Sequence, residues 1–246
     1  MSIRTQLANW PLALLALGAA ACSSTQASVE VEPSMAPYDV AVRSGQAYTM
    51  VIMRRGPAQD AIDRAEMGAL TQAHMDFTAE LAEGDLLLAS GPVVAPRAEP
   101  SMRSIGFYDS ANTSDVHSRV CSDPAVEAGV LEVRSVPFIC ADDIRAIPGM
   151  ERGSRMERGD DMIVARPYVI VEVPTSSAMD AMIQRMDEIV LFSGHCVGGG
   201  FEGSTLIAVD CRTSAEAAEF MGAMGPVADD FLYHPWVSST SVAEMK

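Results

Sequence analysis

Hydrophobic positions along residues 47–140 recur with a period that changes between two and about 3.6, which predicts short strands alternating with helices. The longest stripe of helical spacing is followed by Gly84, a residue type that commonly ends helices. The predicted elements are a strand at 48–53, a helix at 60–83, strands at 86–92 and 103–108, a weaker helix at 113–122 and a strand at 130–138. This order is βαββαβ, the ferredoxin-like arrangement of an α+β fold.

The same order of elements returns after residue 166. It comprises a strand at 167–174, a helix at 177–189, strands at 191–196 and 205–211, a helix opened by the capping box at 213–216, and a strand at 233–242. Two stretches return with it: Leu88-Ala89-Ser90-Gly91 as Leu191-Phe192-Ser193-Gly194, and Asp123-Pro124-Ala125-Val126 as Gly225-Pro226-Val227-Ala228. We interpret the chain as a duplication, with domains at 47–140 and 166–246 joined by a charged, glycine-containing linker at 141–165.

The N-terminus predicts export rather than a folded domain. Residues 1–22 contain an apolar run of about a dozen residues, too short to cross a bilayer but typical of a signal peptide. The small residues before Cys22 resemble the lipobox of bacterial lipoproteins, although Ala19 stands where leucine is usual. With Ser23 next and a flexible tether at 23–46, this implies lipidation of Cys22 and anchoring at the periplasmic face of the cell envelope, in the outer membrane. The alternative is an ordinary cleaved signal peptide with a coincidental cysteine.

Export changes how the other cysteines are interpreted, because disulfides persist in an oxidising compartment. Four cysteines allow three pairings. We expect Cys196–Cys211, which flank a predicted hairpin, and Cys121–Cys140, which would tie a helix end to the following strand. A nucleophilic Cys196 is disfavoured, since its neighbour His195 would point to the opposite face of the strand.

Charge excludes several functions. The chain has 17 basic and 33 acidic residues, a formal charge of −16. A nucleic-acid binder needs a basic surface, so we expect no nucleic-acid partner. The negative charge would also repel anionic lipid headgroups, so we expect membrane contact through the lipid anchor alone. The single lysine, Lys246, is the last residue, which argues against Schiff-base chemistry.

Three segments of the first domain carry a family resemblance, in order and on matching elements. They are Leu70-Thr71-Gln72-Ala73-His74, Leu88-Ala89-Ser90-Gly91-Pro92, and the run 123–130 followed by Ser135-Val136-Pro137-Phe138. Through them, nearly all of residues 47–138 resembles the YCII domain family. The resemblance implies a dimeric α+β barrel whose two sheets face each other across a cleft. It also implies a reactive pair, which motif matching places at His74 and Asp123, and substrates that are small organic acids or lactones.

The second copy resembles this family only in element order and in its Ser193-Gly194 turn. Its first helix has no histidine, and Gly225 stands in place of Asp123. An apolar sheet face needs a second layer to cover it. We therefore expect the second copy to be a scaffold that completes an intramolecular barrel, where single-domain relatives dimerise.

His74 and Asp123 each allow two interpretations. His74 falls on the apolar stripe of its helix, where a lone histidine is usually a core residue, but an imidazole in an apolar cleft also suits proton transfer. Asp123 precedes Pro124 and would suit a simple turn, or it could orient the imidazole.

Other polar residues of the first domain suggest a substrate site. Ser90 and Gly91 end a strand beside the expected cleft, and Arg97 and Arg103 flank the following loop and could hold a carboxylate, although such arginines are often simply solvated. We expect no metal, because the remaining histidines lack ligand spacing, and no cofactor, because no glycine-rich loop leads from a strand into a helix.

The leading hypothesis is an envelope enzyme of the YCII family that performs proton transfer on a small organic acid or lactone, as a lyase, hydrolase or isomerase would. The rival is a non-catalytic ligand-binding or scaffolding module. Both involve a small-molecule ligand, and both are compatible with a homo-oligomer.

Overall fold

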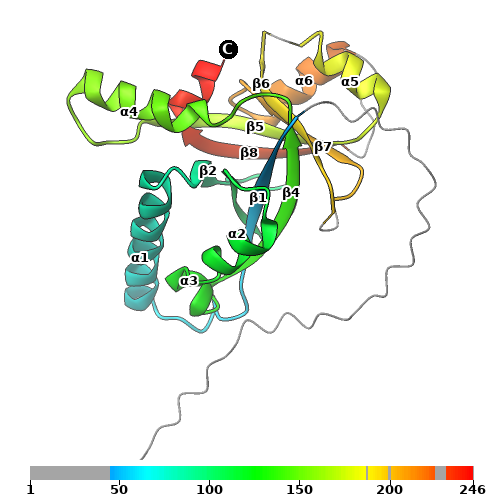
Figure 1. The fold of residues 1–246 in the computed structure, drawn as a ribbon. Helices are drawn as coiled ribbons and strands as arrows, with labels where there is room; N and C mark the ends of the chain where they lie inside the picture. The colour runs from blue at the N-terminus through cyan, green and yellow to red at the C-terminus, as the bar shows by residue number, and fades with distance from the viewer. Residues whose placement is uncertain (1–44, 187, 199–200, 225–230, 246) are drawn as a thin grey trace, which may run out of the picture. The chain divides into compact units, whose positions relative to one another are not determined.

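The computed structural model describes residues 45–186, 188–198, 201–224 and 231–245 (Figure 1). The predicted signal peptide, Cys22, nearly all of the tether and the stretch 225–228 lie outside these residues. Of the helices within the described ranges, none combines the length and the apolar character that a membrane span requires.

The first half of the described chain has the predicted βαββαβ order with one extra helical turn. Its elements are β1 (Gln46–Arg55), α1 (Arg64–Glu83), β2 (Leu87–Pro92), β3 (Met102–Tyr108), α2 (Thr113–Val120), α3 (Pro124–Glu127) and β4 (Leu131–Cys140). Helix α1 begins later than predicted because Asp63 is its N-cap and accepts hydrogen bonds from the backbone N–H groups of Ala65 and Glu66.

The second half repeats this order. Its elements are β5 (Ala165–Pro174), α5 (Ser177–Ile183), β6 (Val190–Cys196), β7 (Ser204–Val209), α6 (Ser214–Met224), β8 (Leu232–Ser239) and a closing 3₁₀ helix, η1 (Thr240–Met245). The alternating and continuous apolar runs of the sequence thus become strands, and the stretches with helical spacing become helices.

All eight strands form one antiparallel sheet with the order β2-β3-β1-β4-β6-β7-β5-β8. The first four positions and the last four repeat one arrangement, since β6, β7, β5 and β8 stand where the first half has β2, β3, β1 and β4. The predicted fold class is therefore confirmed: two ferredoxin-like units form a nearly closed α+β barrel within one chain.

Two equivalent seams join the halves. At one, β4 pairs with β6, and the Val197 N–H donates to the Pro137 carbonyl over 2.9 Å. At the other, Val93 of the strand end after β2 bridges to β8, and the Val94 N–H donates to the Pro235 carbonyl over 2.9 Å. Each half thus lends its fourth strand to the second strand of the other, as two subunits of a dimer would.

The inner face of this sheet is covered by both halves together. Phe107 lies at the centre, with ring centroids 5.2 Å from Phe138, 5.1 Å from Phe192 and 6.1 Å from Trp236. Burying side chains of this size contributes about 1.5–3 kcal/mol each. Separate apolar clusters lie on the outer face, one beneath α1 and α2 and one beneath α5 and α6.

The repeated Ser-Gly pair has a packing role at both seams. A Cβ atom on Gly91 would lie 1.7 Å from the Val237 carbonyl oxygen, and one on Gly194 would lie 2.4 Å from the Phe138 ring. The serine before each glycine is held through its carbonyl: Ser238 Oγ donates to Ser90 over 2.9 Å, and Cys140 Sγ donates to Ser193 over 3.1 Å. Glycine is required because the strands approach too closely for a side chain.

The linker 141–165 contains a helix that the sequence analysis did not predict, α4 (Ala146–Arg158). It ends at Gly159, whose φ of 70° lies in the left-handed region. Its many charges and two internal glycines suggested a loop, but Ile147, Pro148 and Glu151 are buried. Contacts with the neighbouring elements therefore override the weak local preference for a helix.

The two predicted disulfides are not present: Cys121, Cys140, Cys196 and Cys211 form no disulfide within the described chain. Cys196 belongs to the inner cluster and Cys211 to an outer cluster, so the sheet separates them. Cys140 also belongs to the inner cluster, whereas Cys121 follows the last turn of α2, on the outer face. The prediction was wrong because proximity along the chain does not reveal which face of a sheet a side chain occupies.

We expect the substitution Gly91→Ala to lower the free energy of unfolding by about 1–3 kcal/mol or more, because the new methyl group collides with the β8 backbone. Gly153→Ala in α4 is the matched control. Its Cβ would meet nothing within 4 Å, and alanine favours helix by up to about 1 kcal/mol. Urea denaturation of both variants measures the difference in the free energy of unfolding. An unchanged midpoint for Gly91→Ala would contradict the close approach of the β8 backbone to Gly91.

Thiol labelling provides a second test of the inner cluster. Burial, with the charge of Asp142, raises the pKa of Cys140 to about 12, and burial, with the charge of Glu172, raises the pKa of Cys196 to about 12. Both thiols therefore stay protonated as pH rises from 7 to 9, where an ordinary cysteine ionises. Mass spectrometry after brief iodoacetamide treatment should find the partly exposed Cys121 alkylated well before either. In urea, all should react together.

Candidate active site

The central observation is a direct contact between His74 and Asp123. His74 lies in the middle of α1, and its Nδ1 atom is 2.5 Å from Oδ2 of Asp123. The imidazole is 24% exposed, whereas the carboxyl is fully buried. His74 is therefore not a fully buried core residue, although its position on the apolar stripe made that interpretation attractive.

Asp123 is held rigidly by the start of α3. It is the N-cap of that short helix, and its Oδ1 accepts a hydrogen bond of 2.8 Å from the Ala125 N–H. Pro124 takes the first helical position, where its missing N–H costs nothing. One oxygen of Asp123 therefore caps the turn, and the other faces the imidazole of His74.

The surroundings of the pair are apolar on the side of the sheet. Tyr108 is 2% exposed, and its burial, together with the nearby charge of Asp123, raises its pKa above the ordinary value. The carboxyl of Asp123 therefore lies beside a neutral tyrosine and has no contact with bulk water. The charge-assisted bond to His74 is correspondingly strong.

This geometry fixes how the imidazole can react. With Asp123 ionised, Nδ1 carries the proton and donates it to the carboxylate, which leaves Nε2 as the acceptor. Among the described residues, Nε2 of His74 has no hydrogen-bond partner, and the ring is partly exposed. The arrangement can accept a proton at Nε2 and return it, with the carboxylate stabilising the charged ring in between.

Ser90 and Gly91 lie elsewhere on the first half. Ser90 lines a cavity together with Ala82 and residues of α4 and β8, but His74 is not part of that lining. Ala82 follows His74 by eight residues in α1, which corresponds to about 12 Å along a helix. The structure thus places the Ser-Gly pair at a seam and His74 nearer the middle of α1.

The two predicted arginines donate hydrogen bonds to backbone carbonyls near the loop between β2 and β3. Arg97 Nε donates to the Val93 carbonyl over 2.8 Å, and Arg103 donates to the carbonyls of Pro100 and Met102 over 2.7 and 3.0 Å. Burial lowers the pKa of Arg103, as do the positive charges of Arg97 and Arg55. Arg97 on the loop, Arg103 in β3 and Arg55 in β1 thus form a basic group, and the hydrogen bonds of Arg97 and Arg103 go to backbone carbonyls and not to the His74–Asp123 pair.

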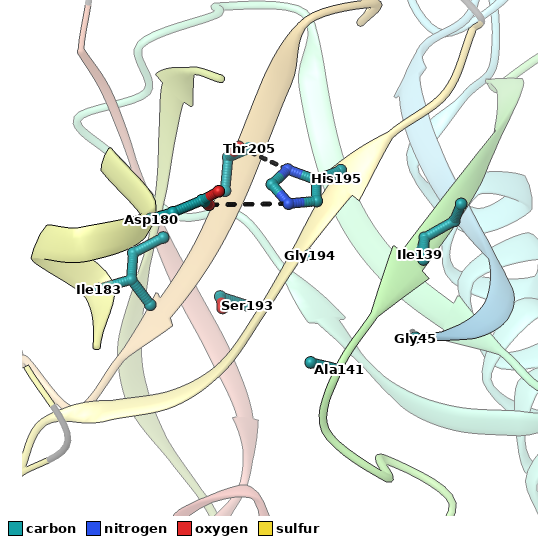
Figure 2. Close-up of a pocket in the computed structure, with 9 residues that line it drawn as sticks. All are labelled: Gly45, Ile139, Ala141, Asp180, Ile183, Ser193, Gly194, His195 and Thr205. Atoms are coloured by element: carbon teal, nitrogen blue, oxygen red, sulfur yellow. Dashed lines mark hydrogen bonds and ion pairs between the residues drawn. The ribbon is translucent and has the colours of Figure 1, made fainter. Parts of the chain in front are cut away.

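A second histidine–aspartate pair was not foreseen (Figure 2). His195 Nε2 lies 3.8 Å from Asp180 Oδ1, and its Nδ1 is 2.9 Å from the hydroxyl of Thr205, which bonds to Thr175 over 2.8 Å. The pocket beside it has a volume of about 10 Å³, room for about one water molecule. It is too small for a substrate, so we assign this pair a structural role.

The other histidines also have polar partners. His117 lies 3.5 Å from Cys121 Sγ and 3.2 Å from Ser135 Oγ, and the buried His234 lies 3.4 Å from Glu172. Within the described ranges, no three or more His, Cys, Asp or Glu side chains are grouped so as to hold a metal ion.

Comparison with known proteins gives a family match for the first half of the described chain. Residues 47–138 match the family model of the YCII-related domain. The chain therefore carries a YCII-related domain. Its bounds enclose nearly all of β1 and β4 and both residues of the His74–Asp123 pair. Comparisons with curated proteins and with solved structures gave no match.

The family match does not extend to the second half, although the second half has the same strand order as the first. Residues 166–246 repeat the element order and the strand order of the YCII-related domain. Register repeats as well: Tyr48 faces Phe138 across β1 and β4, and Tyr168 faces Trp236 across β5 and β8. The two halves therefore share a backbone arrangement, whereas the family model matches only the first of them.

Proposed function

We propose that the YCII-related domain performs proton-transfer chemistry on a small organic acid or lactone, with His74 as general acid and base and Asp123 as the residue that orients it. The observation that carries this proposal is the 2.5 Å contact between His74 Nδ1 and a fully buried Asp123 carboxyl. An imidazole with one nitrogen held and the other open is the arrangement that general acid–base catalysis requires.

The chemistry follows from the open Nε2 atom. In an organic acid or its lactone, Nε2 would remove a proton from the carbon beside the carbonyl and return it to the same or a neighbouring atom. In lactone hydrolysis it would remove a proton from the attacking water and deliver it to the leaving alkoxide. In both cases Asp123 stabilises the imidazolium that exists between the two steps.

The second half would act as a scaffold in this proposal. It covers the inner face of the YCII-related domain, while α1 and α2 of the domain itself cover the outer face. A homo-oligomer is compatible with this fold, but the barrel within one chain does not require one.

The decisive variants are His74→Gln and Asp123→Asn, compared with His117→Gln, which changes a partly buried histidine outside the pair. We expect the wild type to exchange the α-hydrogens of acetoacetate in D₂O or to open γ-butyrolactone, both followed by NMR. His74→Gln should lose about 10²–10⁴-fold of that rate, because this is the usual contribution of one general acid–base. His117→Gln should keep it.

The rival interpretation, a non-catalytic module, has a distinct outcome. The wild type would then show neither reaction above the uncatalysed rate, and His74→Gln would change only the free energy of unfolding. An imidazole of His74 that stays neutral and unresponsive from pH 5 to 8 by NMR would also contradict the proposal.

We further propose that the chain is held at the periplasmic face of the outer membrane through a lipidated Cys22. The support is the sequence of residues 1–46, and the charge of −16 argues against binding of anionic lipids by the folded part. In cells fed radioactive palmitate, the wild type should be labelled and sediment with membranes. Cys22→Ala should be unlabelled, and labelling of that variant would contradict the anchor.

A further inference from the structure

Cys121 and His117 form a thiol–imidazole pair at the end of α2. Cys121 Sγ lies 3.5 Å from His117 Nε2, which is within hydrogen-bond distance for a sulfur atom. The two residues are four positions apart, so the helix brings both side chains to the same face. Among the described cysteines, Cys121 is partly exposed, whereas Cys140, Cys196 and Cys211 are buried. Cys121 is therefore the described thiol that a small molecule can reach.

The imidazole of His117 is oriented by a third group. Its Nδ1 atom lies 3.2 Å from the hydroxyl of Ser135 in β4, the strand against which α2 packs. A thiol hydrogen that points at Nε2 requires the ring proton to be on Nδ1, which then donates to Ser135 Oγ. Nucleophile, base and orienting hydroxyl thus follow one another, and this is the arrangement that activates cysteine nucleophiles.

The charged groups near the pair are compatible with a thiolate, the reactive form of cysteine. When the thiol proton moves to Nε2, the thiolate lies beside an imidazolium. Arg119 adds a second positive charge to the last turn of α2. The carboxyl of Asp123, two residues after Cys121, is turned to His74 instead. The imidazolium of His117 is thus the charge that contacts the sulfur atom.

A mixed disulfide formed at Cys121 would persist, because the other described thiols lie in different clusters. Cys140 and Cys196 belong to the inner cluster, on the opposite face of the sheet, and Cys211 belongs to the outer cluster of the second half. Neither cavity described above is lined by Cys121 or His117. Exchange with a small disulfide needs only an accessible thiolate, whereas acyl transfer also needs donors for an oxyanion. The geometry therefore favours disulfide exchange.

We propose that Cys121 is a thiol–disulfide exchange site for low-molecular-weight disulfides, with His117 as its base and Ser135 as a positioning residue. The Cys121 thiolate attacks one sulfur atom of the disulfide, and a new S–S bond forms as the old one breaks. The thiolate that leaves takes the proton from His117 Nε2. Cys121 is thereby oxidised to a mixed disulfide, and the other half of the disulfide is reduced to a free thiol. The site does not depend on the function proposed for the His74–Asp123 pair.

Reaction of the purified chain with 2-hydroxyethyl disulfide at pH 6 tests this proposal. An ordinary thiol is less than about 1% ionised at that pH. Mass spectrometry should find the mixed disulfide at Cys121, formed about tenfold faster in the folded chain than in urea, because the gain in thiolate exceeds its loss of nucleophilicity. A cysteine without an activating partner would react faster in urea, which exposes it. No adduct, or a folded rate no higher than the rate in urea, would overturn the proposal.

The histidine is tested by His117→Gln, which removes the base and leaves Cys121 in place. We expect the exchange rate of the folded chain to fall about tenfold. His195→Gln changes a partly buried histidine of the second half and is the matched control, which should react as the wild type does. An unchanged rate in His117→Gln would contradict the role of the pair.

Two variants of Ser135 keep the test decisive if His117→Gln does not fold. Ser135→Ala removes the hydroxyl that holds Nδ1 and should slow the exchange severalfold, whereas Ser135→Thr keeps a hydroxyl and should react as the wild type does. Equal rates in Ser135→Ala and the wild type would contradict the positioning role. His74→Gln should exchange normally, which separates this site from the catalytic proposal.

Discussion

The apolar inner face of the first four strands is the constraint on which the rest of the molecule depends. Phe107 and Phe138 lie on that face, and water would contact both if nothing covered them. Phe192 and Trp236 of the second half cover them, and all four belong to one buried cluster. Because this cluster is shared, neither half can unfold or move away without exposing the inner face of the other.

Close approach at the two seams follows from that shared interior. The strands of the two halves meet so tightly that Gly91 and Gly194 have no room for a Cβ atom. The Ser-Gly stretch that is common to both halves is thus explained by packing. The assembled seam also creates a cavity beside β2, where α4 brings Glu151 against the end of β8.

The outer face of the sheet is not shared between the halves, and the candidate active site lies on this face. Helices α1 and α3 need not cover the interior, so they can hold a polar pair, His74 and Asp123, at the edge of an apolar layer. Asp123 is buried because it caps α3, and the same burial strengthens its bond to the imidazole. One carboxylate thus both caps a helix and makes a long-range contact with the imidazole of His74.

The sequence by itself determined the eight strands and most of the helices that flank them, because periods of two and 3.6 mark which face of each segment is apolar. It also named His74 and Asp123, through motifs that resemble a family rather than through spacing. It did not reveal that Asp180 meets His195, that α4 is a helix, or that Cys196 and Cys211 lie on opposite faces. Those facts depend on strand order and on contacts between distant segments, which only the tertiary structure decides.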